Sequence, residues 1–171
     1  MPKSKLDRID LELLNLLQTQ GNMTIKDLSA KVGLSAGPLH RRLKILEKND
    51  IIKGYRALFN LARIGYDQLA FLEVTLKSGE NSDGKFDEQI TKVNNIIEAY
   101  RIEKSLALSG SRYLLKVALR HEEDATDWVA KNISQNGTVA TVQVLPVEQV
   151  IDDSGFFSLR EFYNRRVPLK K

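Results

Sequence analysis

Basic residues recur at helical spacing between Ala36 and Lys48, opposite a row of leucines. The leucines fall at intervals of three and four residues, so they share one face of a helix. The opposite face carries Gly37, His40, Arg41, Lys44 and Lys48, flanked by Arg42 and Glu47. Such a helix suits a DNA major groove, because the leucines attach it to its own domain while the cations meet phosphates and base edges. For this segment alone, a solvated surface helix is the alternative.

The residues before this basic helix supply the elements that would position it. Apolar spacing predicts a shorter helix over residues 25–32, with Thr24 as its N-cap. Gly33 is expected to end that helix in a left-handed conformation. Ser35 is expected to cap the basic helix, with Pro38 in its first turn. Two short helices joined by such a turn predict a helix-turn-helix.

Two flanking segments complete the predicted head. Residues 7–19 have the apolar spacing of a first helix, and residues 51–60 read as a strand that forms a short wing or a linker. We predict DNA contacts by the following residues of the head: Thr24, Ser35, Gly37, Pro38, His40, Arg41, Arg42, Lys44 and Lys48. Lys26, Lys53 and Arg56 are predicted to reach phosphates, although plain solvent exposure explains the last two equally well.

Charge is distributed unevenly along the 171 residues. Residues 1–60 hold 11 Lys and Arg against 6 Asp and Glu, a net charge of +5. Residues 61–155 hold 10 Lys and Arg against 15 Asp and Glu, a net charge of −5. Residues 156–171 hold 5 Lys and Arg against 1 Glu, a net charge of +4. The two ends are therefore expected to face polyanions.

The chain has no cysteine, no apolar signal segment and no membrane-length apolar run, so we expect a soluble cytoplasmic protein without membrane contact.

From residue 69 the pattern predicts alternating strands and helices. The expected order is strand 69–77, helix 85–94, strand 97–108, strand 112–120, helix 122–134 and strand 138–150. Pro146 is expected to place part of the last strand at an edge or bulge. This order is that of a ferredoxin-like βαββαβ domain, in which two helices cover one sheet face. We expect a second subunit to cover the other face. The fold class is thus α+β.

The last residues have a composition of their own. Residues 156–171 combine four aromatic with five basic residues, and the spacing Ser158 to Glu161 fits a capping box. We predict a short helix that docks on protein through Phe157 and Phe162. DNA contact by Arg165 and Arg166 is the competing interpretation. The predicted organisation is a head over 1–50, a strand linker over 51–66, a ferredoxin-like domain over 67–153 and an extension over 154–171.

Four segments make the chain resemble the leucine-responsive regulator/asparagine-regulator (Lrp/AsnC) family of transcription factors. They are LDRIDLELLNLLQ (6–18), DLSAKVGLS (27–35), RRLKILE (41–47) and IIKGYRALFN (51–60), with a weaker match in LSGSRYLLKV (108–117). The resemblance implies a helix-turn-helix head, a linker strand and a ferredoxin-like domain that forms dimers and often tetramers or octamers. It also implies an amino-acid effector near the glycine turn, which here is Ser109, Gly110, Ser111 and Arg112.

That turn departs from the family pattern, because the family usually has acidic residues directly after the glycine and this chain has Arg112. Two alternatives follow. The effector is a different and anionic molecule, either an amino acid or an organic acid, or the protein has no effector. In the second case Gly110 only turns a hairpin and Arg112 is solvated.

The expected function is therefore sequence-specific transcriptional regulation through double-stranded DNA, with no enzymatic activity and no cofactor. Only His40 and His121 could shuttle protons near neutral pH, and no phosphate loop, metal spacing or nucleophile motif is present. An architectural protein that coats DNA with little specificity is the first alternative. An enzyme like the sirohaem decarboxylases, which share this architecture, is a remote one.

Overall fold

The computed structural model describes residues 6–79, 82–102, 110–135 and 137–151. These residues form two compact units, 6–58 and 59–151. The predicted helical tail, Ser109 and the end of the predicted strand 97–108 lie outside the described residues. No helix in the described part of the chain is long and apolar enough to cross a membrane.

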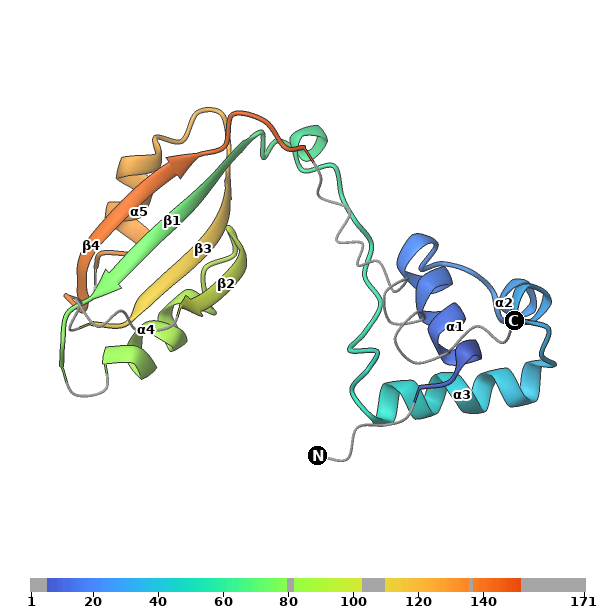
Figure 1. Cartoon of the computed structure of the whole chain (residues 1–171). Coiled ribbons are helices and arrows are strands. Elements are labelled where there is room, and N and C mark those ends of the chain that lie inside the picture. Colours follow the sequence, from blue (N-terminus) through green and yellow to red (C-terminus); the bar gives the residue numbers. More distant parts are fainter. Residues whose placement is uncertain (1–5, 80–81, 103–109, 136, 152–171) are drawn as a thin grey trace, which may run out of the picture. The chain divides into compact units, whose positions relative to one another are not determined.

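The first unit contains three helices: α1 (Arg8–Thr19), α2 (Ile25–Val32) and α3 (Ala36–Lys48) (Figure 1). The bounds of α2 and α3 are those predicted from the sequence. Leu13, Leu28, Leu39 and Leu43 form the core of this unit, and Leu13 and Leu39 are fully buried. The predicted leucine face of α3 is thus confirmed.

Local capping interactions explain where these helices begin and end. Asp7 caps α1 in a reciprocal capping box with Asp10. The Thr24 side chain accepts a hydrogen bond from the Asp27 N–H at 3.2 Å, and Gly33 ends α2 with φ of 69°. Ser35 occupies the N-cap position of α3 with extended backbone, but its side chain forms no capping hydrogen bond. The predicted cap is therefore correct in position and wrong in its side-chain interaction.

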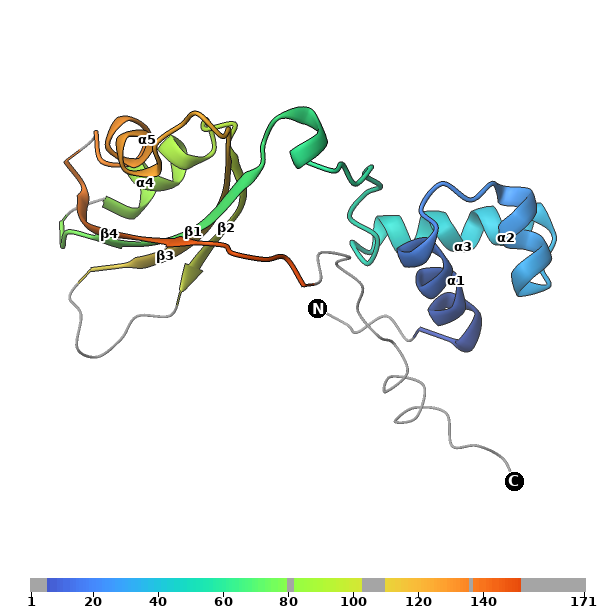
Figure 2. The ribbon, with the colours of Figure 1, turned by 90° about the horizontal axis from the view of Figure 1, so that it is seen from above.

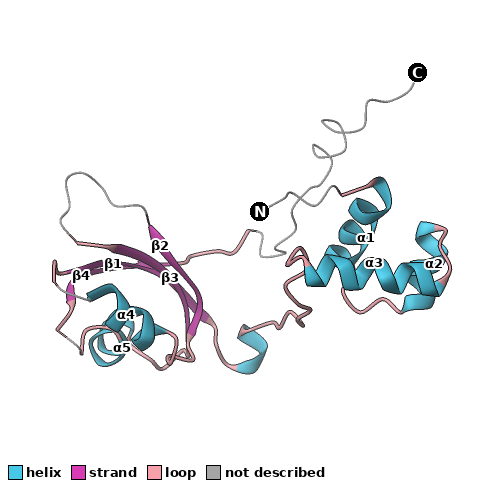
Figure 3. Cartoon of the chain, turned by 90° about the horizontal axis from the view of Figure 1, so that it is seen from below, coloured by secondary structure: helices cyan, strands magenta, loops and turns pink. Residues whose placement is uncertain are grey.

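The predicted strand over residues 51–60 is wrong. The backbone after α3 is irregular, and Figure 3 draws it as a loop. A strand requires a hydrogen-bonded neighbour, and no described residue forms a ladder with this segment. Its β-branched and aromatic composition suits a pleated surface, but composition alone cannot provide the partner.

The second unit is the predicted ferredoxin-like domain. After a short 3-10 turn, η1 (Ala62–Ile64), its elements are β1 (Gln68–Leu76), α4 (Ser82–Ile90), β2 (Ile96–Ile102), β3 (Arg112–Leu119), α5 (Ala125–Asn132) and β4 (Val139–Pro146). The strands pair antiparallel in the order β2-β3-β1-β4. Helices α4 and α5 lie on the same side of the sheet (Figure 2). The α+β fold class is confirmed.

Several predicted bounds in this unit are shifted for local reasons. The helix α5 begins three residues late, because the Asp124 carboxylate accepts hydrogen bonds from the N–H groups of Thr126 and Asp127. The helix α4 covers 82–90 rather than 85–94, since a tight turn follows Ile90. The strand β4 lies at a sheet edge and ends at Pro146, as expected for a residue without an N–H.

The core of this unit lies between the sheet and the two helices. Alternate residues of β1, among them Leu72 and Val74, point to the helix side and are buried. On β3, Tyr113 is 2% exposed and meets Phe86 of α4 edge-to-face, with the ring centroids 4.8 Å apart. This packing fixes α4 against the start of β3, next to the predicted glycine turn.

Candidate nucleic-acid interface

The outward face of α3 carries the small and basic residues that the sequence predicted. Gly37, His40, Arg41, Lys44 and Lys48 are all exposed, while the leucine face of the helix is buried. The apolar face fixes the rotation of α3 about its axis, because turning the helix would expose fully buried leucines. The structure therefore presents these five residues together on one surface.

The cations of this surface have no acidic partner in the part of the chain that the structure describes. Within the described residues, Arg41, Lys44 and Lys48 form no ion pair with a carboxylate. The nearby Glu47 carboxylate instead accepts a hydrogen bond from the Tyr55 hydroxyl at 3.1 Å. Burial, followed by this bond, raises the pKa of Tyr55, so the phenol stays a donor near neutral pH. The sequence analysis did not anticipate Tyr55, whose contact with Glu47 forms only after residues 51–55 fold back on α3.

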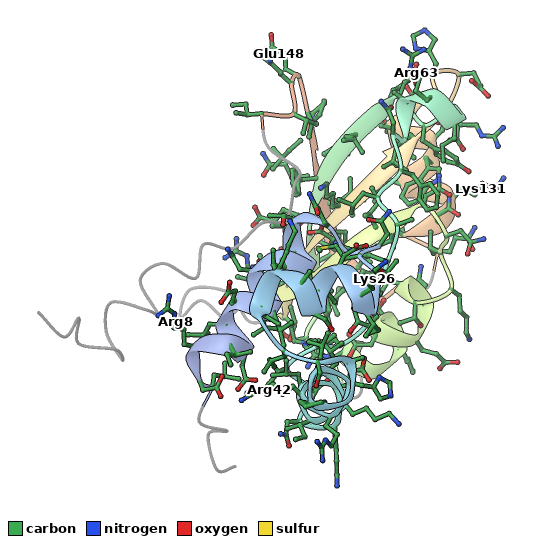
Figure 4. The ribbon with its side chains drawn as sticks, turned by 90° about the vertical axis from the view of Figure 1, so that its right-hand side faces the viewer. Arg8, Lys26, Arg42, Arg63, Lys131 and Glu148 are labelled. Carbon is green, nitrogen blue, oxygen red and sulfur yellow. The ribbon has the colours of Figure 1, made fainter. Side chains whose placement is uncertain are left out.

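Arg42 has a different role from its neighbours. Its Nη1 atom lies 2.7 Å from a carboxylate oxygen of Asp7 and 2.7 Å from one of Asp10, so the guanidinium joins α3 to α1 (Figure 4). Hydrogen bonds to Asp10 and Asp7 raise the pKa of Arg42. Arg42 thus differs from Arg41 and Lys44 in having two carboxylate partners within the head, and its predicted DNA contact stays a prediction.

The remaining predicted contacts lie at the start of α2, at the start of α3 and in the segment after α3. The Thr24 hydroxyl is already engaged, since it donates to the Asp27 carboxylate at 2.6 Å as well as capping α2. Ser35 is exposed and Pro38 is half-buried in the first turn of α3. Lys26 is exposed on α2 (Figure 4). Lys53 and Arg56 are exposed in the irregular segment after α3.

Gly110 is required for a close approach between backbones. A Cβ atom added there would lie 1.7 Å from the Leu76 carbonyl oxygen and 2.8 Å from its carbon. The sequence analysis offered an effector-binding turn or a simple hairpin turn for this glycine. The structure adds a third role, because only a residue without a side chain fits against the end of β1.

Ser111 and Arg112 point to opposite faces of the sheet. Ser111 is 4% exposed and its hydroxyl donates to the Asp83 carboxylate of α4 at 2.9 Å. Arg112 forms an ion pair with Glu73 on the face that the helices leave uncovered. Of the predicted effector residues that the structure describes, Ser111 and Arg112 therefore face different sides of the sheet. The alternative of a solvated Arg112 is wrong, since its side chain is only 24% exposed.

A polar network next to this turn was not apparent from the sequence. The Tyr113 hydroxyl donates to Asp87 at 2.8 Å and accepts from Arg101 Nε at 3.0 Å. Burial raises the pKa of Tyr113 to about 12, assisted by the hydrogen bond to Asp87. Arg101 also pairs with Asp83, at 3.9 Å, and with Asp87. Two carboxylates of α4 therefore lie near the start of β3, although the sequence shows none directly after the glycine.

Comparisons with known proteins agree with this architecture. The sequence profile of a family described as "Winged helix-turn-helix DNA-binding" matches residues 6–53. The leucine-responsive regulatory protein of Rhizobium meliloti (strain 1021) is 33% identical over 150 residues, which cover 86% of this chain and 93% of that protein. The chain belongs to the Lrp/AsnC family of transcriptional regulators.

Other relatives of this Lrp/AsnC regulator cover most of its length. The proline dehydrogenase transcriptional activator of Rhizobium radiobacter is 31% identical over 151 residues, which cover 88% of this chain and 94% of that protein. A Neisseria meningitidis transcriptional regulator, solved as an L-Met complex, matches with a TM-score of 0.82 at 24% identity, over 92% of this chain and 99% of that one. Escherichia coli AsnC matches with a TM-score of 0.74 at 21% identity, over 88% of this chain and 97% of the AsnC chain. These two structures support the fold.

Proposed function

We propose that this regulator recognises specific DNA sequences through the outward face of α3, with Arg41 and Lys44 as the principal contacts. The main support is that α3 buries its leucine face and leaves these cations exposed, without a carboxylate partner among the described residues. Arginine is suited to bidentate contact with guanine, and lysine to phosphate or guanine. Lys48 and Lys26 would add phosphate contacts at the edges of the surface.

The test is DNA affinity as a function of salt concentration for the double variant Arg41→Ala/Lys44→Ala. A base-reading arginine is worth about 1–3 kcal/mol, and each lost phosphate contact should reduce the salt slope by about one. Lys31→Ala is a matched control, because Lys31 is exposed on α2 outside the proposed surface. Unchanged affinity and salt slope in the double variant would show that the assignment is wrong.

Selection of bound sequences from random DNA tests specificity. We expect enrichment of a pseudo-palindromic site, and a flat selection would favour the architectural, low-specificity alternative.

We further propose that two copies pair through the uncovered sheet face. That face carries apolar residues from all four strands, interspersed with the ion pairs Arg112–Glu73 and Lys116–Glu98. The apolar residues are Leu69, Phe71, Tyr100, Leu114 and Leu145, and Tyr100 and Leu145 are 53% and 40% exposed. Pairing two such faces would remove this surface from water. Two recognition helices related by a two-fold axis would then lie about 34–36 Å apart on DNA.

Light scattering at micromolar concentration tests this pairing. We expect a dimer or a larger assembly for the natural chain and dissociation for Phe71→Glu. Ala130→Glu on the exposed side of α5 is the control and should leave the mass unchanged. A monomeric natural chain would exclude the proposed dimer.

A small molecule that modulates DNA binding is a further part of the proposal, with its site beside Gly110 and Ser111. The support is the pair of α4 carboxylates, Asp83 and Asp87, which lie near the turn and attract a cation, since both pair with the Arg101 guanidinium. An ammonium group of the ligand would have to share these carboxylates with Arg101 or displace it. Calorimetric titration with amino acids and with organic acids distinguishes the two ligand classes. Binding that is unaffected by Asp83→Asn would place the site elsewhere.

A further inference from the structure

A groove between α4 and α5 gathers positive charge in a unit that is otherwise acidic. It has a volume of about 570 Å³ and lies on the side of the unit that carries the two helices. Its walls are formed by Lys85, Glu88, Gln89, Lys92, Val93, Lys131, Asn132 and Gln135. The groove is open to solvent on one side, and its volume is in the range of sites that hold small organic ligands.

The charges that line the groove are not balanced. Three of the lining residues are lysines and one is a glutamate, which leaves a net charge of +2. The glutamate, Glu88, already pairs with Lys92 at 2.7 Å, and that pairing lowers its pKa. Lys85 and Lys131 have no carboxylate partner among the described residues, and Lys131 is labelled on α5 in Figure 4. Two cations from opposite walls are therefore available to a ligand.

The floor of the groove is held in place by hydrogen bonds between the two helices. Gln89 of α4 donates from Nε2 to the carbonyl oxygens of Asn132, at 2.7 Å, and Ile133, at 3.1 Å. These carbonyls belong to the negative end of α5, so the bonds occupy groups that would otherwise repel an anion. Asn132 in turn donates to the Trp128 carbonyl at 2.9 Å. The spacing of the two helices at the groove is thus fixed without a ligand, and only the lysine side chains would have to be ordered on binding.

We propose that this groove binds a small phosphate-bearing anion of the size of pyrophosphate or a nucleotide. Lysine ammonium groups bind phosphate as point charges, and cations on both walls suit a ligand with two or more phosphate charges. The site lies in the second unit, is formed by different residues from the α3 surface, and does not depend on the proposed DNA recognition. It would give the regulator a ligand site separate from the glycine turn.

Calorimetric titration of the full chain with inorganic pyrophosphate tests the proposal at low salt, where charge interactions are screened least. We expect saturable binding that weakens at least tenfold in Lys85→Gln/Lys131→Gln. The control Arg63→Gln/Lys77→Gln removes the same charge from exposed positions of this unit outside the groove, and it should change the affinity less than twofold. Absence of binding, or equal losses in the two double variants, would overturn the proposal.

The same variants separate a small ligand from DNA phosphates. A shallower salt slope of DNA binding in Lys85→Gln/Lys131→Gln, without pyrophosphate binding by the natural chain, would assign the groove to the DNA backbone and overturn the small-ligand site. The Arg41→Ala/Lys44→Ala variant should bind pyrophosphate normally while losing DNA affinity. The groove and the recognition surface can therefore fail independently.

Discussion

Replacing Gly110 by alanine should destabilise the sheet unit more than any ordinary glycine substitution. The new Cβ would lie 1.7 Å from the Leu76 carbonyl oxygen, whereas real Cβ contacts are essentially never below 3.0 Å. The obstacle is backbone, so the end of β1 would have to move by about 1.3 Å to restore the 3.0 Å contact. Leu76 is 2% exposed, and its N–H donates to the Ser111 carbonyl at 2.9 Å. The shift would therefore disturb both packing and a hydrogen bond.

The magnitude follows from these two losses. Overpacking a close-packed site costs about 1–3 kcal/mol, and a lost backbone hydrogen bond about 1 kcal/mol. We expect Gly110→Ala to lower the free energy of unfolding by roughly 2–4 kcal/mol, a large share of the stability of a typical domain. Urea unfolding followed by the fluorescence of Trp128, the single tryptophan, reports on this unit specifically.

Gly84→Ala is the matched control for this measurement. Gly84 is exposed within α4 and is not among the described glycines with positive φ. Gly84 lies in the first turn of α4, so alanine there should stabilise the unit slightly, by less than about 1 kcal/mol. A loss below about 1 kcal/mol for Gly110→Ala, with an unchanged m-value, would refute the reasoning, because β1 would then tolerate the displacement. The role of Gly110 would in that case be conformational or ligand-related.

Three further predictions concern the head. Leu39→Ala should destabilise the head by about 2–5 kcal/mol, because Leu39 is fully buried. In a urea titration, the helical circular dichroism signal should then be lost at a lower urea concentration than the Trp128 fluorescence changes. Thr24→Ala should cost about 1 kcal/mol through the lost cap of α2, with Thr24→Ser largely restoring it in the same urea titration. Burial raises the pKa of Asp7, but hydrogen bonds from the Asp10 N–H and from Arg42 outweigh it and hold that pKa below its ordinary value. The stability from this carboxylate is therefore complete above the unfolded pKa of about 3.9 and is lost as the pH falls through the lower folded value. A pH titration of head stability should show a smaller acid loss in Arg42→Ala, and identical curves would exclude the bridge as the cause.

The helices of the head could be predicted accurately from the sequence, because the features that begin and end them are local. Helices α2 and α3 have the predicted bounds, since apolar spacing, a threonine cap and a left-handed glycine act within a few residues. The prediction of a strand over residues 51–60 was wrong, because a strand depends on a hydrogen-bonded partner that the segment itself does not contain. The α4 and α5 bounds shifted for a related reason, since several competing starts were available and one capping side chain, Asp124, decided the start of α5.

The sequence by itself determined the order of helices and strands apart from the strand predicted over residues 51–60, the buried leucine face of α3 and the family resemblance, because periodicity and local motifs carry that information. Only the tertiary structure decided which neighbours each side chain meets. Arg42 looks like its neighbour Arg41 in the sequence, yet Asp7 and Asp10 of α1 engage it across 32 or more positions. Ser111 and Arg112 are adjacent in the chain, yet the alternation of a β-strand sends them to opposite faces. Ion pairs, close backbone approaches and grooves are formed by residues distant in sequence, so their physical cause lies in the packing of whole elements.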